Sequence, residues 1–150
     1  MTPVRRLDHV AILVRDSEQA LHFYRDRLGL SVAWREEIDV PPVRLTYLST
    51  GNAYLQLVEP LDGETALSAW LDERGEGLHH ICFGVDDAEA TARRLSDPGH
   101  DVNLGSGRGR VSAFVETSAG SGVRIECTAF DHSLDVDATP GWIEPSLRVG

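Results

Sequence analysis

Two segments of the chain that lie 71 positions apart repeat the same pattern of residues, and this repeat restricts the possible folds more than any other feature. The segment Leu7-Asp-His-Val-Ala-Ile-Leu-Val-Arg-Asp-Ser-Glu corresponds to Leu78-His-His-Ile-Cys-Phe-Gly-Val-Asp-Asp-Ala-Glu. At an offset of 70, Tyr54-Leu-Gln-Leu then matches Arg124-Ile-Glu-Cys. Because the match extends from the first strand of each half to the last, we infer a duplicated unit rather than two segments with ordinary apolar patterns.

Each half has the pattern of one strand, one helix and three further strands. In the first half, Asp16-Ser-Glu-Gln is typical of a helix start, and the apolar residues Ala20, Phe23, Tyr24 and Leu28 then fall on one helical face. The strands expected there are 7–14, 30–36, 42–49 and 53–59. The second half predicts a helix over 87–96 and strands at 78–85, 101–104, 110–115 and 122–128. The expected fold class is therefore α+β, with two βαβββ modules in tandem.

The length of 150 residues favours a single domain over 1–150. Its expected parts are module one (about 6–60), a linking helix (about 65–74), module two (about 77–129) and an extended tail (131–150). In the linking helix, Leu67, Trp70 and Leu71 are expected to face the core.

The formal net charge of −10 argues against nucleic acid and anionic membranes as partners, because both bind through clustered Lys and Arg. No apolar run approaches the roughly 20 residues that span a bilayer. The first residues lead into a strand pattern rather than a signal peptide, so we expect a cytoplasmic protein. Cys82 and Cys127 are too few for a disulfide scaffold and are expected to be reduced structural thiols.

Four polar residues occupy corresponding positions on strands of the two halves: His9, Gln56, His80 and Glu126. If the first and last strands of each half lie side by side, His9 meets Gln56 and His80 meets Glu126. Two imidazoles, an amide oxygen and a carboxylate suit a divalent ion such as cobalt, nickel, manganese, iron or zinc. Four protein ligands leave two positions of an octahedral ion for substrate, which is a catalytic arrangement. A register error of one residue would exchange His79 for His80.

Three arginines are candidates for binding an anionic group of a substrate. Arg124 is expected on the face of Glu126, where it binds a substrate carboxylate or, alternatively, pairs with Glu126 or reaches solvent. The segment Gly105-Ser-Gly-Arg-Gly-Arg lacks the strand-to-helix context of a phosphate-binding loop. It is expected to form a flexible turn or pocket lid, with Arg108 and Arg110 as anion contacts.

The motifs Leu7-Asp-His-Val-Ala-Ile, Leu55-Gln-Leu-Val-Glu-Pro, Gly75-Glu-Gly-Leu-His-His-Ile and Val123-Arg-Ile-Glu resemble those of the vicinal-oxygen-chelate superfamily, most closely its methylmalonyl-CoA epimerases. The resemblance covers about 6–128. It implies a glyoxalase-like open barrel, a homodimer and a small-molecule substrate, such as an acyl-CoA. It also implies a metal-dependent isomerase or epimerase that acts through an enolate-like intermediate, in which Glu126 also serves one face of the reacting carbon.

The sequence departs from this family pattern at two places. Many members carry a glutamate that acts as a base on the third strand, where this chain has Leu45, which is expected to line the substrate site. Glu36, Glu37 and Asp39 lie near the start of that strand; they are either exposed turn charges, which is the more usual case, or alternative sources of that acid. After Phe114-Val, the family commonly shows His-Pro-Lys and this chain has Glu116-Thr-Ser.

These departures keep other functions open. One alternative is a glyoxalase-type lyase or another carbonyl isomerase that acts on a substrate without coenzyme A. A second alternative is a metal-free, resistance-type protein that binds a small molecule. An iron dioxygenase fits less well, because its facial triad of three ligands would leave Gln56 surplus.

Overall fold

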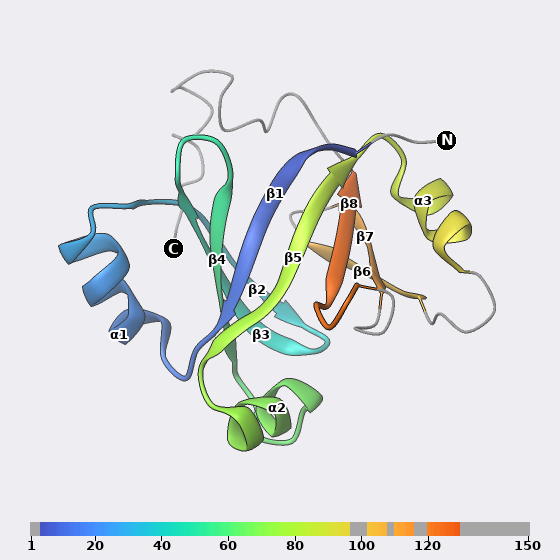
Figure 1. Cartoon of the computed structure of the whole chain (residues 1–150). Helices are drawn as coiled ribbons and strands as arrows, with labels where there is room; N and C mark the ends of the chain where they lie inside the picture. Colours follow the sequence, from blue (N-terminus) through green and yellow to red (C-terminus); the bar gives the residue numbers. More distant parts are fainter. Residues whose placement is uncertain (1–3, 97–101, 108–109, 116–119, 130–150) are drawn as a thin grey trace. The chain divides into compact units, whose positions relative to one another are not determined.

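The computed structural model describes residues 4–96, 102–107, 110–115 and 120–129 (Figure 1). Its elements follow the predicted order of two βαβββ modules joined by a helix. The first module contains β1 (Val4–Leu13), α1 (Ser17–Leu21), the π-helix η1 (His22–Arg27), β2 (Ser31–Asp39), β3 (Pro42–Ser49) and β4 (Tyr54–Pro60). The linking helix is α2 (Ala66–Arg74). The second module contains β5 (Gly77–Val85), α3 (Ala88–Leu95), β6 (Val102–Gly107), β7 (Arg110–Val115) and β8 (Ile125–Ala129). No helix in these ranges is long and apolar enough to cross a membrane.

The chain separates into two compact units whose boundaries lie inside β1 and β5. Unit 1 contains β1 up to Val10 and the elements from His80 onward, and unit 2 contains the elements from Ala11 to His79. In unit 2 the strand order is β2-β3-β4-β1, and in unit 1 it is β1-β5-β8-β7-β6. The first and last strands of each module, β1 with β4 and β5 with β8, are therefore neighbours, as the repeat predicted.

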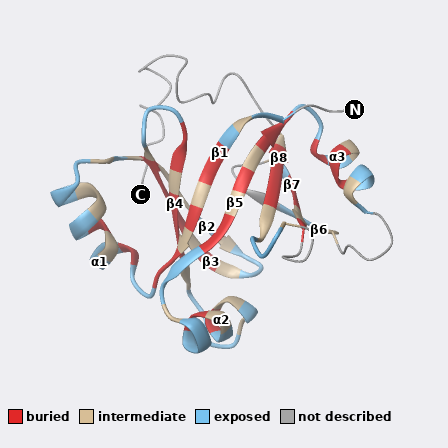
Figure 2. Ribbon diagram, viewed as in Figure 1, coloured by how far each residue is buried: buried red, intermediate tan, exposed pale blue. Residues whose placement is uncertain are grey.

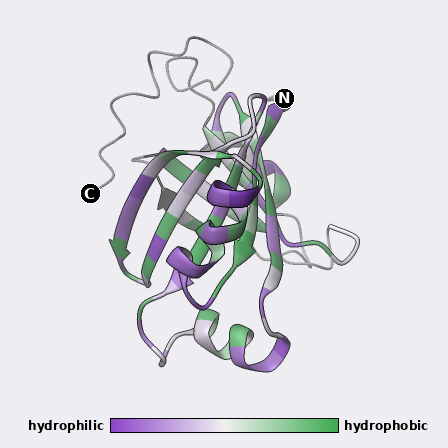
Figure 3. Cartoon of the chain, turned by 90° about the vertical axis from the view of Figure 1, so that its left-hand side faces the viewer, coloured by the Kyte–Doolittle hydropathy of each residue, from purple (hydrophilic) through white to green (hydrophobic). Residues whose placement is uncertain are grey.

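In unit 2, Asp16 caps α1 by accepting hydrogen bonds from the backbone N–H groups of Glu18 and Gln19. Figure 3 shows that α1 and η1 carry mostly hydrophilic residues. Of the four apolar residues predicted to share one helical face, Ala20 and Tyr24 pack against a buried cluster, whereas Phe23 and Leu28 are exposed. The N–H of Leu28 donates to the carbonyl of Phe23, five residues earlier, so the wider π turn breaks the helical spacing on which that prediction depended.

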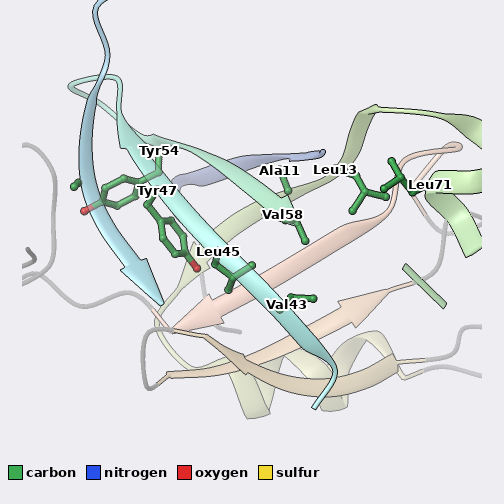
Figure 4. Packing of buried hydrophobic residues seen from close by; sticks show 9 residues of the cluster. Ala11, Leu13, Val43, Leu45, Tyr47, Tyr54, Val58 and Leu71 are labelled. Carbon is green, nitrogen blue, oxygen red and sulfur yellow. The ribbon is translucent and has the colours of Figure 1, made fainter. Parts of the chain in front are cut away.

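A hydrophobic cluster covers one face of the strands of unit 2. Figure 4 shows its buried members Ala11, Leu13, Val43, Leu45, Tyr47, Tyr54, Val58 and Leu71. Leu67 and Trp70 of α2 also pack against this cluster, as predicted for the linking helix. In the antiparallel pair β3–β4, Leu45 lies opposite Val58 and Tyr47 lies opposite Gln56. Because residues opposite each other in a ladder share a face, Gln56 lies on the same face as Tyr47, at the polar edge of this hydrophobic cluster.

In unit 1, β5 and β8 are parallel neighbours, whereas β6, β7 and β8 pair antiparallel. Figure 2 shows buried residues along the central parts of β5 and β8. The helix α3 begins after Asp87, whose carboxylate accepts from the N–H of Ala90, and it packs against β7 and β8. In the glycine-rich segment, Gly105 lies within β6 and Arg110 begins β7. Residues 108 and 109, where the expected turn or lid falls, lie outside the described residues.

We expect Leu45→Ala to lower the free energy of unfolding by about 2–5 kcal/mol, because truncation of a buried leucine leaves a cavity. Leu45 is 7% exposed, whereas Leu78, also in unit 2, is 73% exposed. Leu78→Ala is therefore the matched control and should change stability by no more than about 0.5 kcal/mol. Urea denaturation of both variants measures the difference. Equal losses would show that Leu45 does not belong to the packed core.

Candidate metal centre

His9, His80 and Glu126 meet in the interior of unit 1. They come from three adjacent strands, β1, β5 and β8, and all three side chains are buried. The Nε2 atoms of His9 and His80 are 3.2 Å apart. The Glu126 Oε1 atom lies 3.1 Å from Nε2 of His9 and 3.0 Å from Nε2 of His80. The three candidate ligand atoms therefore form a nearly equilateral triangle, which we call the His–His–Glu triangle.

The strand register explains this convergence. Glu126 lies beside Cys82 in the parallel ladder of β5 and β8. His80 precedes Cys82 by two residues and so shares its face of β5. The ring of Phe114, which lies opposite Glu126 on β7, contacts the His80 ring edge-on at 5.4 Å between centroids. The strand register and the Phe114 ring together hold the His80 imidazole beside the Glu126 carboxylate.

The charges in the triangle are strongly coupled. Burial alone would raise the pKa of Glu126, but hydrogen bonds and charge from His80 and His9 hold that pKa well below its usual range. Burial also opposes protonation of His9, yet Asp8 and Glu126 together raise the pKa of its imidazole. The pKa of His80 is lowered, mainly by burial and also by the positive charges of His9 and Arg124. Glu126 is therefore a stable anion facing two imidazole nitrogens.

This arrangement fits a divalent cation. Metal–ligand distances of about 2.0–2.2 Å place adjacent ligands of an octahedral ion about 3 Å apart, which is the spacing of the three atoms. A cation at the centre of the triangle would contact all three of these atoms at once. Nitrogen and oxygen ligands of this kind suit borderline divalent metals.

Gln56 lies in unit 2, where its amide is fixed by Tyr47. The amide Nε2 donates to the Tyr47 hydroxyl oxygen at 2.8 Å. Within the described ranges, the buried Oε1 atom of Gln56 has no hydrogen-bond partner. An amide oxygen left without a donor in a buried position is a suitable metal ligand, because a cation would offset its desolvation.

Asp8 is a buried acid beside the triangle that the sequence reasoning missed. Its Oδ2 atom lies 2.8 Å from Nδ1 of His9, and Arg110 Nη2 lies 3.8 Å from its Oδ1 atom. A signal existed in the sequence, because an aspartate within an apolar strand needs a partner if it is buried. The repeat obscured this signal, since the position equivalent to Asp8 in the second module is His79.

The remaining predicted residues have different surroundings. The half-buried Arg124 lies just before β8, with its guanidinium 5.3 Å from the Phe114 ring centroid, and its Nε has no hydrogen-bond partner among the residues described. Arg110 donates from Nη1 to the carbonyl oxygen of Ala129 at 2.6 Å. Arg108 lies outside the described residues. His79 is buried against the Trp70 ring, 4.8 Å between centroids, and takes no part in the triangle.

Comparison with known proteins finds relatives among the epimerases. Over 111 residues, the chain is 34% identical to the ethylmalonyl-CoA/methylmalonyl-CoA epimerase of Cereibacter sphaeroides, covering 73% of this chain and 82% of the relative. The mouse mitochondrial methylmalonyl-CoA epimerase is 32% identical over 132 residues, covering 81% and 71%. The solved structure of a variant of the Streptomyces coelicolor methylmalonyl-CoA epimerase, in complex with 2-nitronate-propionyl-CoA, matches with a TM-score of 0.77 and 31% identity. That match covers 85% of this chain and 95% of the other.

These matches confirm the predicted glyoxalase-like fold and the resemblance to the epimerases. The model of the glyoxalase/bleomycin resistance protein/dioxygenase superfamily matches residues 8–127, from Asp8 at the triangle to Cys127 next to Glu126. Its span includes both modules and every residue of the candidate centre. The chain therefore belongs to the glyoxalase/bleomycin resistance protein/dioxygenase superfamily.

Proposed function

We propose that this protein is a metal-dependent epimerase that exchanges the proton on a carbon next to a carbonyl group. The buried His–His–Glu triangle is the observation that carries this proposal. The epimerase relatives, at about 30% identity, support the reaction class. Methylmalonyl-CoA or a related acyl-CoA is the substrate class that the names of these relatives suggest for this chain.

In this proposal, His9, His80 and Glu126 hold the cation, and Gln56 is the fourth ligand that the sequence repeat predicts. A bound divalent cation polarises a carbonyl oxygen and so makes the neighbouring C–H bond more acidic. Arg124 binds the carboxylate of the substrate, because its guanidinium lies over the Phe114 ring and its Nε–H has no partner among the described residues. The positive charge of Arg124 contributes to the lowered pKa of His80, which supports placing Arg124 beside the His–His–Glu triangle.

The proton acceptor needs a separate assignment. Glu126 has a pKa well below its usual range, which suits a ligand better than a base, since a base works best with a pKa near the working pH. On β2, Glu36 lies directly opposite Leu45 of β3, and opposite residues in an antiparallel ladder share a face. Trp34 Nε1 donates to the Glu36 carboxylate at 3.2 Å. We therefore assign to Glu36 the role of the acid that Leu45 replaces in the sequence.

The surroundings of Leu45 favour a second function. Leu45 sits among apolar side chains, where a shorter or more apolar carbonyl compound would fit better than a dicarboxylic thioester. The alternative is therefore a lyase or isomerase that acts on a carbonyl substrate without coenzyme A. A metal-free binding role is less favoured, because it would leave the three close ligand groups without a cation.

We expect the wild-type protein to bind one divalent ion per chain, and His80→Ala to lose most of this binding. The reason is that the alanine removes one vertex of the triangle. Elemental analysis after reconstitution with Co²⁺ or Mn²⁺ measures the stoichiometry. His22→Ala is the matched control, because His22 is exposed and bonds only Asp26 among the interactions described for it. Absence of stoichiometric metal from reconstituted wild type would refute the proposed function.

We expect Gln56→Ala to weaken metal binding less than Glu126→Ala, because a neutral amide attracts a dication less than a carboxylate does. Isothermal titration gives both dissociation constants, and Glu126→Gln separates the loss of charge from the loss of the side chain. Circular dichroism checks that each variant is folded. Equal losses in the two alanine variants would contradict the assignment of Glu126 as the anionic ligand.

With methylmalonyl-CoA in heavy water, we expect the metal-loaded protein to exchange the α-hydrogen measurably but to epimerise poorly, because a single base, Glu36, is assigned and Glu126 is held as a ligand. Glu36→Gln should lower exchange by at least about tenfold, since a positioned base contributes about 10²–10⁴ to the rate. Leu45→Glu should raise racemisation more than exchange. Mass spectrometry of deuterium uptake and chiral analysis of the product measure the two processes.

The matched control in this experiment is Glu37→Gln. Glu37 is adjacent in sequence but faces the other side of β2, where it pairs with Arg44. It should leave exchange unchanged. No exchange from either wild type or Leu45→Glu would remove methylmalonyl-CoA as the substrate and favour the alternative carbonyl compounds.

A further inference from the structure

We infer that Asp8 is a positioning residue that orients the imidazole of His9 toward the metal, and that Arg110 holds Asp8 in place. This inference rests on the proposed function, because it assigns a role toward the same cation. Asp8, His9 and Arg110 all belong to unit 1. The role of Asp8 does not follow from the repeat, since the second module has His79 at the equivalent position.

The hydrogen bond between Asp8 and His9 selects one tautomer of the imidazole. The buried Asp8 carboxylate lies 2.8 Å from His9 Nδ1, so it accepts the Nδ1–H proton. The lone pair of the ring is then left on Nε2, which is the atom that faces His80 and Glu126. A carboxylate behind a metal-binding histidine fixes the ring orientation and makes the ligand nitrogen more basic.

The contact with Arg110 explains how the Asp8 carboxylate, the second carboxylate beside His9 after that of Glu126, remains buried. One Asp8 oxygen faces His9, and the other lies 3.8 Å from Arg110 Nη2. The Arg110 guanidinium is itself tied to the sheet, because Nη1 donates to the carbonyl oxygen of Ala129 at the end of β8. The positive charge of Arg110 balances the charge that a buried aspartate would otherwise carry at high cost. Arg110 thus contributes to the framework of the centre rather than to binding of a substrate anion.

Asp8 also belongs to a second group of potential ligands. Ligand atoms of Asp8, His9 and the buried Cys82 lie within 4.8 Å of one another. If these residues bound an ion of their own, Asp8 would be a ligand instead of an orienting group. The number of ions per chain distinguishes the two roles, because the positioning role requires one ion and the ligand role requires two.

The test measures Co²⁺ binding to wild type and Asp8→Asn by isothermal titration, and records the Co²⁺ absorption bands. We expect Asp8→Asn to bind one ion about 10–100 times more weakly, with shifted bands, because outer hydrogen-bond partners of ligands have effects of this size. The matched control is Asp86→Asn, which removes the same charge from the exposed pair with Arg5. Its affinity and spectrum should equal those of wild type.

A second measurement needs no variant. Nitrogen-15 NMR of the histidine rings in the Zn²⁺-loaded wild-type protein identifies which nitrogen of His9 carries the proton, and we expect Nδ1. A proton on Nε2, or equal affinity of wild type and Asp8→Asn, would overturn the positioning role while leaving the proposed function intact. Two ions per chain, reduced to one in Cys82→Ser, would also overturn it. Failure of the wild type to bind any ion would instead overturn the proposed function and this inference together.

Discussion

The burial of Glu126 between two imidazoles is the interaction on which the rest of the centre depends. A carboxylate removed from water is costly unless positive charge or hydrogen-bond donors surround it. His9 and His80 supply this environment and keep the carboxyl ionised, although burial alone would protonate it. The arrangement is self-consistent only when protons or a cation occupy the space between the three groups. The same electrostatic requirement that makes the triangle costly to bury also makes it a candidate site for a dication.

The sheet of unit 1 holds these groups in place at a fixed separation. Neighbouring strands lie about 4.8 Å apart, so side chains on the same face of β1, β5 and β8 can converge without long reach. The parallel register of β5 and β8 sets Glu126 relative to Cys82 and therefore relative to His80. Asp8 and Arg110 add a second layer of charge behind His9. The ligands are consequently carried by rigid strands, which hold a site more accurately than loops do.

The internal repeat was sufficient to predict the order of strands and helices, because apolar periodicity and helix caps are local signals. It also selected His9, His80 and Glu126, which the structure brings together. Local signals could not predict the π-helix η1, because its hydrogen bond between Leu28 and Phe23 alters the spacing that a helical pattern assumes. Nor could they assign Arg110, because Asp8 and Ala129, which it contacts, are distant in sequence and come together only when the strands pair.

Many members of the resembled family carry a glutamate where this chain has Leu45. The leucine changes the electrostatics of one face of unit 2 more than it changes the shape of that face. Leucine and glutamate side chains are similar in length, but leucine adds apolar surface to a cluster that already includes Val43 and Val58. The carboxylate of Glu36 lies across the ladder from that position and is only partly buried. A carboxylate in this setting keeps more contact with water than one in the middle of the cluster. If Glu36 serves as the base, proton removal also depends on how strongly a bound cation would acidify the substrate carbon.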